Sequence, residues 1–220
     1  MHISAEPPIL YFGTPVVLLS TLNDDGSANL APMSSAWWLG WNCMLGLGAK
    51  GHTARNLQKR RECVINLPSA DMVEAVNRLA RLTGSDPVPP HKVAMGYRHE
   101  KHKFESAGLT GLSSHLVHAP RVTECPVHLE AVLESVHPFG NRPDNAPGAL
   151  AFEMRVVRAH IDGALLVEGT RDHIDPDKWR PLMMSFCEFY GLGERLFPSR
   201  LAEIPAEAYR PAARMMKQEE

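Results

Sequence analysis

Two long segments of alternating hydrophobic and polar residues constrain the fold of this chain most strongly. In the segment 126–136 one face carries Val127, Leu129, Ala131 and Leu133, and the other positions include His128, Glu130 and Glu134. The segment 150–161 alternates in the same way through Phe152, Met154 and Val156. A period of two places successive side chains on opposite faces of a strand, so that one face is buried and the other meets solvent. We therefore predict two long antiparallel strands.

Shorter apolar segments predict further strands. These are residues 15–21 and 27–34, joined by a turn at Asn23-Asp24-Asp25-Gly26, and residues 43–47, 63–67 and 164–167. Polar residues with interspersed apolar positions predict short helices at 53–60 and from Ser69 to Gly84. Long alternating strands with tight turns and only short helices indicate a mainly β fold, a β-barrel with some α structure, rather than repeated βαβ units.

The chain of 220 residues is long enough for one substantial core. We expect a single domain over 1–220, interrupted by an irregular insertion at about 86–112 that is rich in Pro, His and Lys. From about residue 176 we expect a C-terminal tail, with a helical piece at WRPLMMSFCEFYG (residues 179–191).

Charge and composition exclude several classes of protein. The 23 Lys and Arg residues nearly balance the 25 Asp and Glu residues, and no dense basic block occurs, so neither nucleic acid nor an anionic membrane is an expected partner. The first residues do not have the pattern of a secretory signal, and we expect a cytoplasmic protein without a membrane span. Cys43, Cys63, Cys125 and Cys187 form no C-x-x-C pair, which predicts buried, reduced thiols.

The stretch from Asn29 to Asn56 is the strongest candidate for a binding site. It joins a polar strand end to a Gly-rich turn that carries Lys50 and leads into a helix start at Thr53. Free N–H groups in a first helical turn, the helix dipole and one ammonium together favour a phosphate. We therefore predict a phosphorylated cofactor between two strands and a helix start.

A dinucleotide-binding unit is the alternative interpretation of this stretch. Gly46 to Gly51 matches G-x-G-x-x-G after a predicted strand, and Asp71 follows at about the expected spacing of roughly 20 residues. The predicted helix after the turn is short and basic, however, and no further strand and helix alternation follows it. The motif alone is weak evidence.

Metal binding and nucleophilic catalysis have less support in the sequence. The pairs His99/His102 and His115/His118 have metal-ligand spacing, but no Cys, Asp or Glu completes a set, so we expect no metal site. No G-x-S-x-G elbow is present, and no catalytic residue is assigned.

Several motifs together resemble the flavin reductase-like family. They are NLAPMSS (29–35) followed by Lys50-x-x-Thr53-x-x-Asn56, then GLT (108–110), APRV (119–122), ECPVHLE (124–130), VVRAHI (156–161) and IDP (174–176). The resemblance implies an FMN-binding split β-barrel that forms homodimers. It also implies that Asn29, Ala31, Pro32, Met33, Ser34 and Ser35 line the isoalloxazine and ribityl portion of the flavin, and that Ala49, Lys50, Thr53 and Asn56 hold its phosphate.

The function implied by this resemblance is an FMN-dependent oxidoreductase that moves a hydride from NADH or NADPH to bound flavin, FAD being the other candidate flavin. A monooxygenase or another electron acceptor would be the partner. Asp172-His173 stands where many members have Gly-Asp-His near the nicotinamide, and the role of these two residues stays open. The alternatives are a flavoredoxin-type electron carrier, which is not an enzyme, and a split-barrel protein that binds haem.

Overall fold

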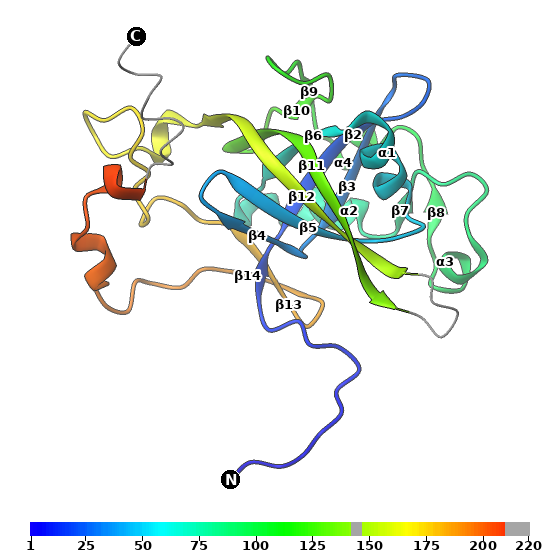
Figure 1. Cartoon of the computed structure of the whole chain (residues 1–220), viewed down its shortest axis with the longest axis horizontal. Helices are drawn as coiled ribbons and strands as arrows, with labels where there is room; N and C mark the ends of the chain where they lie inside the picture. Colours follow the sequence, from blue (N-terminus) through cyan, green and yellow to red (C-terminus); the bar gives the residue numbers. More distant parts are fainter. Residues whose placement is uncertain (142–146, 210–220) are drawn as a thin grey trace.

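A seven-stranded sheet forms the centre of the computed structural model, which describes residues 1–141 and 147–209 (Figure 1). Its strand order is β3-β2-β6-β11-β12-β5-β4. All of its pairings are antiparallel, as the alternating pattern predicts and as a dinucleotide-binding unit does not allow. The strands are β2 (Val17–Leu22), β3 (Ala28–Met33), β4 (Ala36–Leu39), β5 (Asn42–Gly48), β6 (Glu62–Leu67), β11 (Val127–Asn141) and β12 (Pro147–Ile161).

The long strands β11 and β12 pair with each other from Val127 opposite Ile161 to Asn141 opposite Pro147. Both strands are longer than the alternating segments that predicted them. Two irregularities, after Glu130 and after Leu133, shift the register. Such bulges bend a strand and increase its twist, which helps a sheet to curve toward a barrel.

Hydrophobic clusters cover both faces of β2. Val17 and Leu19 belong to the cluster that helix α1 (His52–Arg60) covers with Ala54 and Leu57. Leu18 faces the opposite cluster, together with residues of α2 (Val73–Leu79) and α4 (Lys103–Ala107). Burial on both faces favours apolar residues at successive positions, which explains the continuous run from Val16 to Leu19. The two helical layers also place the start of α1 near the end of α2.

Short elements connect the sheet to its helical layers. The segment 86–112 contains α3 (Pro90–Ala94), β8 (Arg98–His99), α4 and β9 (Gly111–Leu112), and β8 pairs in parallel with β7 (Leu82–Thr83). The segment predicted as an irregular insertion thus contains short regular elements, and its residues Ala107 and Leu109 are buried in the cluster on the α2 side. The strand β10 (Arg121–Val122) pairs with β9, and η1 (Ala70–Met72) precedes α2.

The predicted helical piece at 179–191 is a β-hairpin. Its strands are β13 (Leu182–Ser185) and β14 (Glu188–Gly191), and β13 also pairs with β1 (Thr14–Pro15). Phe186 and Cys187 form the two-residue turn with φ angles of 47° and 67°. Two adjacent left-handed residues are the requirement of the tight hairpin turn, and neither residue type signals it in the sequence. Further along lie η3 (Arg200–Glu203) and η4 (Ala206–Tyr209), and the end of the predicted tail, 210–220, falls outside the described residues.

Three smaller expectations also need correction. Residues 164–167 do not return as a strand, because η2 (Gly163–Leu165) forms there and the Asp162 carboxylate accepts a hydrogen bond from Ala164 N at 2.9 Å. The helix predicted from Ser69 to Gly84 is divided into η1, α2 and β7. Cys187 is exposed, whereas the other three free cysteines are buried. In the described part of the chain no helix is long and apolar enough to cross a membrane.

Candidate functional site

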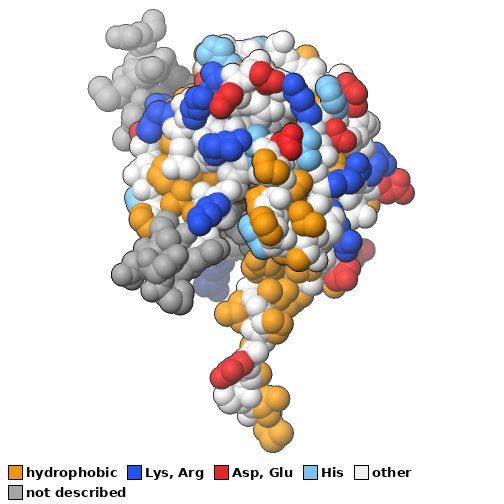
Figure 2. Space-filling model, turned by 90° about the vertical axis from the view of Figure 1, so that its right-hand side faces the viewer, with side chains coloured by type: hydrophobic (Ala, Val, Ile, Leu, Met, Phe, Trp, Pro, Cys, Tyr) orange, Lys and Arg blue, Asp and Glu red, His pale blue; other side chains and the backbone are white. Residues whose placement is uncertain are grey.

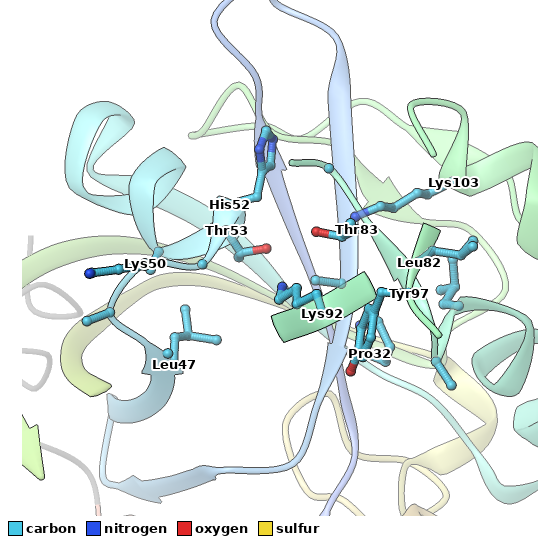
Figure 3. Close-up of a pocket in the computed structure, with 18 of the residues that line it drawn as sticks. Pro32, Leu47, Lys50, His52, Thr53, Leu82, Thr83, Lys92, Tyr97 and Lys103 are labelled. Atoms are coloured by element: carbon cyan, nitrogen blue, oxygen red, sulfur yellow. The ribbon is translucent and has the colours of Figure 1, made fainter. Parts of the chain in front are cut away.

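A pocket of about 390 Å³ lies between the start of α1 and the end of α2 (Figure 3). The ends of β3 and β5 form one wall, and β7 with the segment 86–112 forms the other. The described residues that line it are Ala31, Pro32, Leu47, Gly48, Ala49, Lys50, Gly51, His52, Thr53, Ala54, Leu79, Ala80, Leu82, Thr83, Gly84, His91, Lys92, Tyr97, Lys103 and Gly148. This set contains three lysines and no carboxylate, so the pocket favours an anionic ligand.

Half of the ten predicted site residues line this pocket. They are Ala31, Pro32, Ala49, Lys50 and Thr53. Met33 and Ser34 line a smaller neighbouring pocket of about 160 Å³, which shares Pro32 and Ala80 with the first. The carbonyl of Ser35 accepts a hydrogen bond from Gly46 N at 2.7 Å, which ties the end of this segment to β5.

The remaining two predicted residues lie behind the wall of the pocket. Asn29 and Asn56 are each 2% exposed, and their amides contact other side chains. Asn29 Nδ2 donates to Thr21 Oγ1 at 3.1 Å and to Thr53 Oγ1 at 3.2 Å. Asn56 Nδ2 donates to Thr21 Oγ1 at 3.2 Å and to Asn23 Oδ1 at 3.0 Å. The Asn56 amide thus positions β2 and the β2–β3 turn against α1, and its part in holding a phosphate stays a prediction.

The start of α1 presents free backbone donors to the pocket. Helix geometry leaves the first N–H groups without intrahelical acceptors, and α1 begins after Gly51 without a side-chain cap. The helix dipole places partial positive charge at the same end. Lys50 is exposed, and in Figure 3 its side chain points away from the space that Thr53, Thr83 and Lys103 face. The predicted cation is thus at the rim of the pocket.

His52 is neutral and held from both ring nitrogens. Arg55 contacts Nδ1 at 2.9 Å, and because a guanidinium only donates, Nδ1 is the acceptor. Nε2 therefore carries the proton and donates to Asn23 Oδ1 at 2.7 Å. Burial, reinforced by the charge of Arg55, lowers the pKa of His52 to about 4. A Cβ atom on Gly84 would lie 2.5 Å from His52 Cδ2, so only glycine allows this close packing.

Residues of β7 and the segment 86–112 form the part of the site that the sequence did not reveal. Thr83, Lys92, Tyr97 and Lys103 all line the pocket. Lys103 is 3% exposed, and its Nζ donates to Asn29 Oδ1 at 2.8 Å. Burial, with a smaller contribution from Lys92, lowers the pKa of Lys103 to about 8.

The local sequence gives no signal for this role of Lys103. Figure 2 shows the face that carries α3 and β8, where Lys, Arg and His side chains gather with interspersed Asp and Glu above a hydrophobic band. Lys101, two residues before Lys103, is half-exposed and pairs with Asp25 at 2.7 Å, as basic residues in a polar segment usually do. A composition rich in Lys and His therefore does not distinguish the two lysines.

The histidines that have metal-ligand spacing lie elsewhere. His99 and His102 are exposed, His118 Nδ1 contacts Glu62 at 3.0 Å, and His115 packs edge-on against His160. Among the residues that the structure describes, no group of three or more His, Cys, Asp and Glu is arranged to hold a metal ion.

His128 and Asp172-His173 also lie outside the described lining of the pocket. His128 donates from Nε2 to the carbonyl of Val122 at 2.7 Å, and burial lowers its pKa. In the segment after β12, His173 Nδ1 lies 4.0 Å from Asp172 Oδ1. None of these three residues is among the described residues that line the pocket, and their roles stay open.

The arrangement suits an elongated ligand with one anionic end. Backbone N–H groups, Thr53, Thr83 and Lys103 form the donor end, and Pro32, Leu47, Leu79 and Leu82 supply apolar walls. Donors at a helix start beside a lysine hold phosphate well, and apolar walls suit a flat ring system.

Comparisons with known proteins identify the family and the fold of the chain. The family model described as "Flavin reductase like domain" matches residues 9–190. A protein of Bacillus subtilis (strain 168), "Uncharacterized protein YdfE", is 38% identical over 191 residues, which are 87% of this chain and 89% of the relative.

Two solved structures share the fold. Flavoredoxin of Desulfovibrio vulgaris (Miyazaki F) is 22% identical with a TM-score of 0.72, over 93% of this chain and 100% of that chain. Nitrilotriacetate monooxygenase component B from Bacillus cereus is 22% identical with a TM-score of 0.71, over 90% and 99%. The residues that the family model matches, 9–190, include the strands and helices that surround the pocket.

Proposed function

The chain belongs to the flavin reductase-like family and has its split-barrel fold, and from this premise we propose that it is an FMN-dependent oxidoreductase. In this proposal NADH or NADPH supplies a hydride to bound flavin, and the reduced protein passes electrons to an acceptor. The observation that carries the proposal is the pocket at the start of α1, whose described lining contains three lysines, no carboxylate and an apolar wall. FMN has the matching chemistry, because it joins a phosphate dianion to a flat ring system.

The residues present fit FMN at both ends of the pocket. The N–H groups at the start of α1 and the Thr53 hydroxyl would hold the phosphate, with Lys103 behind them and Lys50 at the rim. Ala31 and Pro32 at the end of β3 would lie along the ring system. Met33, Ser34 and Ser35 continue this strand end and stay proposed as part of the flavin surroundings. FAD is a weaker candidate, because its second phosphate and adenosine would need further room beyond the rim.

Bound flavin supplies a hydride acceptor at its N5 atom. The contribution of this chain is to position the ring, to exclude water with the apolar walls and to keep the phosphate anchored during turnover. Hydride transfer needs stacking geometry rather than a side-chain acid or base, so we assign no catalytic residue. His52 does not serve as an acid at neutral pH, because its lowered pKa keeps it neutral and both ring nitrogens are occupied.

We also propose a homodimer and an external electron acceptor. One solved structure with this fold is a component of a monooxygenase and another is a flavoredoxin. By analogy the acceptor of this chain is a monooxygenase or another redox protein. An electron carrier that does not itself oxidise NAD(P)H is the second candidate.

Anaerobic stopped-flow reduction of the FMN-loaded protein with NADH and, separately, NADPH tests the proposal. We expect the visible flavin absorbance to bleach rapidly with at least one nicotinamide. If FMN binds but neither nicotinamide reduces it while a chemical reductant does, the protein is an electron carrier. Protein that takes up no FMN, or that carries a haem spectrum when pure, contradicts the proposal.

A further inference from the structure

Lys103 is a buried cation without an anionic partner. Its side chain is 3% exposed, and the acceptor that it contacts at 2.8 Å is the neutral amide oxygen of Asn29. In residues 1–141 and 147–209 no carboxylate lies within 4.0 Å of its ammonium. Burial of an ammonium without a counter-charge is costly, and an ammonium has three N–H donors to satisfy. The position of Lys103 in the wall of the pocket offers a place for the missing anion.

The contact with Lys103 fixes the orientation of the Asn29 side chain. Because an ammonium only donates, the oxygen of the Asn29 amide must face Lys103. The Asn29 Nδ2 group then points the other way, toward Thr21 and Thr53. The reversed amide would place N–H donors against the ammonium and is excluded.

The orientation of Asn29 in turn decides what the Thr53 hydroxyl does. Thr53 Oγ1 accepts a hydrogen bond from Asn29 Nδ2 at 3.2 Å, so its own O–H proton is left to donate. Thr53 lines the pocket at the start of α1, where the N–H groups also point outward. In Figure 3 the Thr53 hydroxyl and the amino group of Lys103 approach the same region of the pocket from opposite sides. An anion there meets a hydroxyl already turned to donate.

We propose that Lys103 is a positioning residue that makes this pocket specific for a phosphorylated ligand. It acts through Asn29 on the direction of the Thr53 hydroxyl, and its charge supplies the counter-charge for a phosphate. The inference rests on the proposed FMN function and deepens it, because it names a residue outside the strand end and the Gly-rich turn that discriminates FMN from riboflavin. It also gives the segment 86–112 a direct part in ligand selection.

The test compares the affinities of purified variants for FMN and for riboflavin, measured by quenching of flavin fluorescence. Lys103→Met removes the charge and keeps most of the length of the side chain. We expect this variant to lower the affinity for FMN by about tenfold or more and the affinity for riboflavin by less than about threefold, since charge-assisted hydrogen bonds to the phosphate are lost. The matched control is Lys101→Met, which removes an exposed lysine of the same segment and should leave both affinities unchanged.

A second variant separates positioning from a simple structural tie. Asn29→Asp gives Lys103 a carboxylate partner, and a carboxylate no longer donates to Thr53. A structural tie between α4 and β3 would be strengthened by this change, and FMN would bind as in the wild type. The proposal predicts the opposite. The Thr53 hydroxyl turns toward the introduced carboxylate, and the charge of Lys103 is neutralised by that carboxylate instead of by the phosphate. The affinity for FMN then falls about tenfold, while the affinity for riboflavin is nearly unchanged.

A double-mutant cycle with Thr53→Val tests the route through Asn29. If Lys103 acts partly through the hydroxyl, Lys103→Met costs less FMN affinity in the Thr53→Val background than in the wild type. Equal costs in both backgrounds overturn the positioning route. Equal losses for FMN and riboflavin in Lys103→Met overturn the role in specificity. Failure of the wild-type protein to bind FMN is a separate result, which overturns the proposed function and this inference with it.

Discussion

Two buried charges in this molecule, Glu130 and Lys103, have opposite surroundings. Glu130 on β11 is 0% exposed, and its carboxylate accepts from His115 N at 2.9 Å, Leu116 N at 2.6 Å and His160 Nε2 at 2.6 Å. Lys103 contacts one neutral amide and faces a pocket. A buried charge whose partners all come from the chain stabilises the fold. A buried charge with an incomplete set of partners at a cavity is suited to a ligand.

The pKa shifts of the two groups reflect the same difference. Burial alone would raise the pKa of Glu130, but hydrogen bonds from the His115 and Leu116 N–H groups and from His160 outweigh it, so the pKa lies below its ordinary value. For Lys103 burial is the dominant cause, and its pKa is lowered to about 8 because the nearby Glu100 compensates only weakly. The protein stabilises the charged form of Glu130 and leaves the charged form of Lys103 poorly stabilised.

Removal of Glu130 should produce the largest change in stability. Glu130→Ala leaves two backbone N–H groups and His160 without their acceptor, and we expect the free energy of unfolding to fall by roughly 3 to 5 kcal/mol. Chemical denaturation measures this loss. The ratio of riboflavin to FMN dissociation constants should not change, because Glu130 is not among the described residues that line the pocket.

Glu134→Gln is the control for this prediction. Glu134 lies four residues further along the same strand, and its partly exposed carboxylate pairs with Arg155. An exposed ion pair contributes little, so this variant should be nearly as stable as the wild type. Equal stability of Glu130→Ala and Glu134→Gln would contradict the structural role of Glu130.

The preference for FMN should depend on pH in a way that isolates Lys103. Its folded-state pKa of about 8 lies below the ordinary value of 10.5, so Lys103 loses its charge as the pH rises through about 8. The phosphate of FMN is already a dianion above about pH 7. We therefore expect FMN affinity to fall relative to riboflavin by up to about tenfold from pH 7 to pH 10, the cost of a lost charge-assisted contact. Bound phosphate favours the ammonium and moves the midpoint above 8.

Two further observations sharpen this pH prediction. Lys103→Met should give a flat affinity ratio over the same range, and a slope equal to that of the wild type would assign the titration to another group. The stability of the free protein changes with pH in the opposite direction from the FMN affinity. Between the folded pKa of about 8 and the unfolded value of 10.5 the unfolded state binds more protons, so this residue makes stability rise with pH.

Substitution of Lys50 should have a smaller effect than substitution of Glu130 or Lys103. It is exposed at the rim, and Figure 3 shows its side chain directed away from Thr53 and Lys103. We expect Lys50→Ala to weaken FMN roughly two- to fivefold at low salt and hardly at all at high salt, because exposed charges are screened. Salt titration of the FMN affinity measures this. A loss larger than that of Lys103→Met would place the phosphate at the rim.

The sequence predicted the parts of the molecule that depend on local pattern. Alternation predicted β11 and β12, the Asn23–Gly26 turn predicted the β2–β3 hairpin, and the Gly-rich turn predicted the start of α1 close to its observed place. The helix predicted at 179–191 was wrong because Leu, Met and Phe in a row fit a helix as well as a strand, and the turn at Phe186 and Cys187 has no Asn or Gly to mark it.

The residues of the candidate site also divide into those that the local sequence predicts and those that only the tertiary structure reveals. Ala31, Pro32, Ala49, Lys50 and Thr53 lie in the one stretch from Asn29 to Asn56, and the structure places them around one pocket. Lys103 comes from a segment 74 residues away from Asn29, and its burial depends on the packing of α4 against β3 and α2. Nothing in its neighbours distinguishes it from Lys101, so only the tertiary structure reveals its place.

The affinity of the wild-type protein for FMN and for riboflavin, measured side by side near pH 7, tests the central claim most directly. The claim is that the donor end of the pocket, from the start of α1 to Lys103, holds a flavin phosphate. It predicts that FMN binds and that riboflavin binds at least about tenfold more weakly, since only FMN can use these donors. Equal affinities for the two flavins, or no binding of FMN, would contradict it.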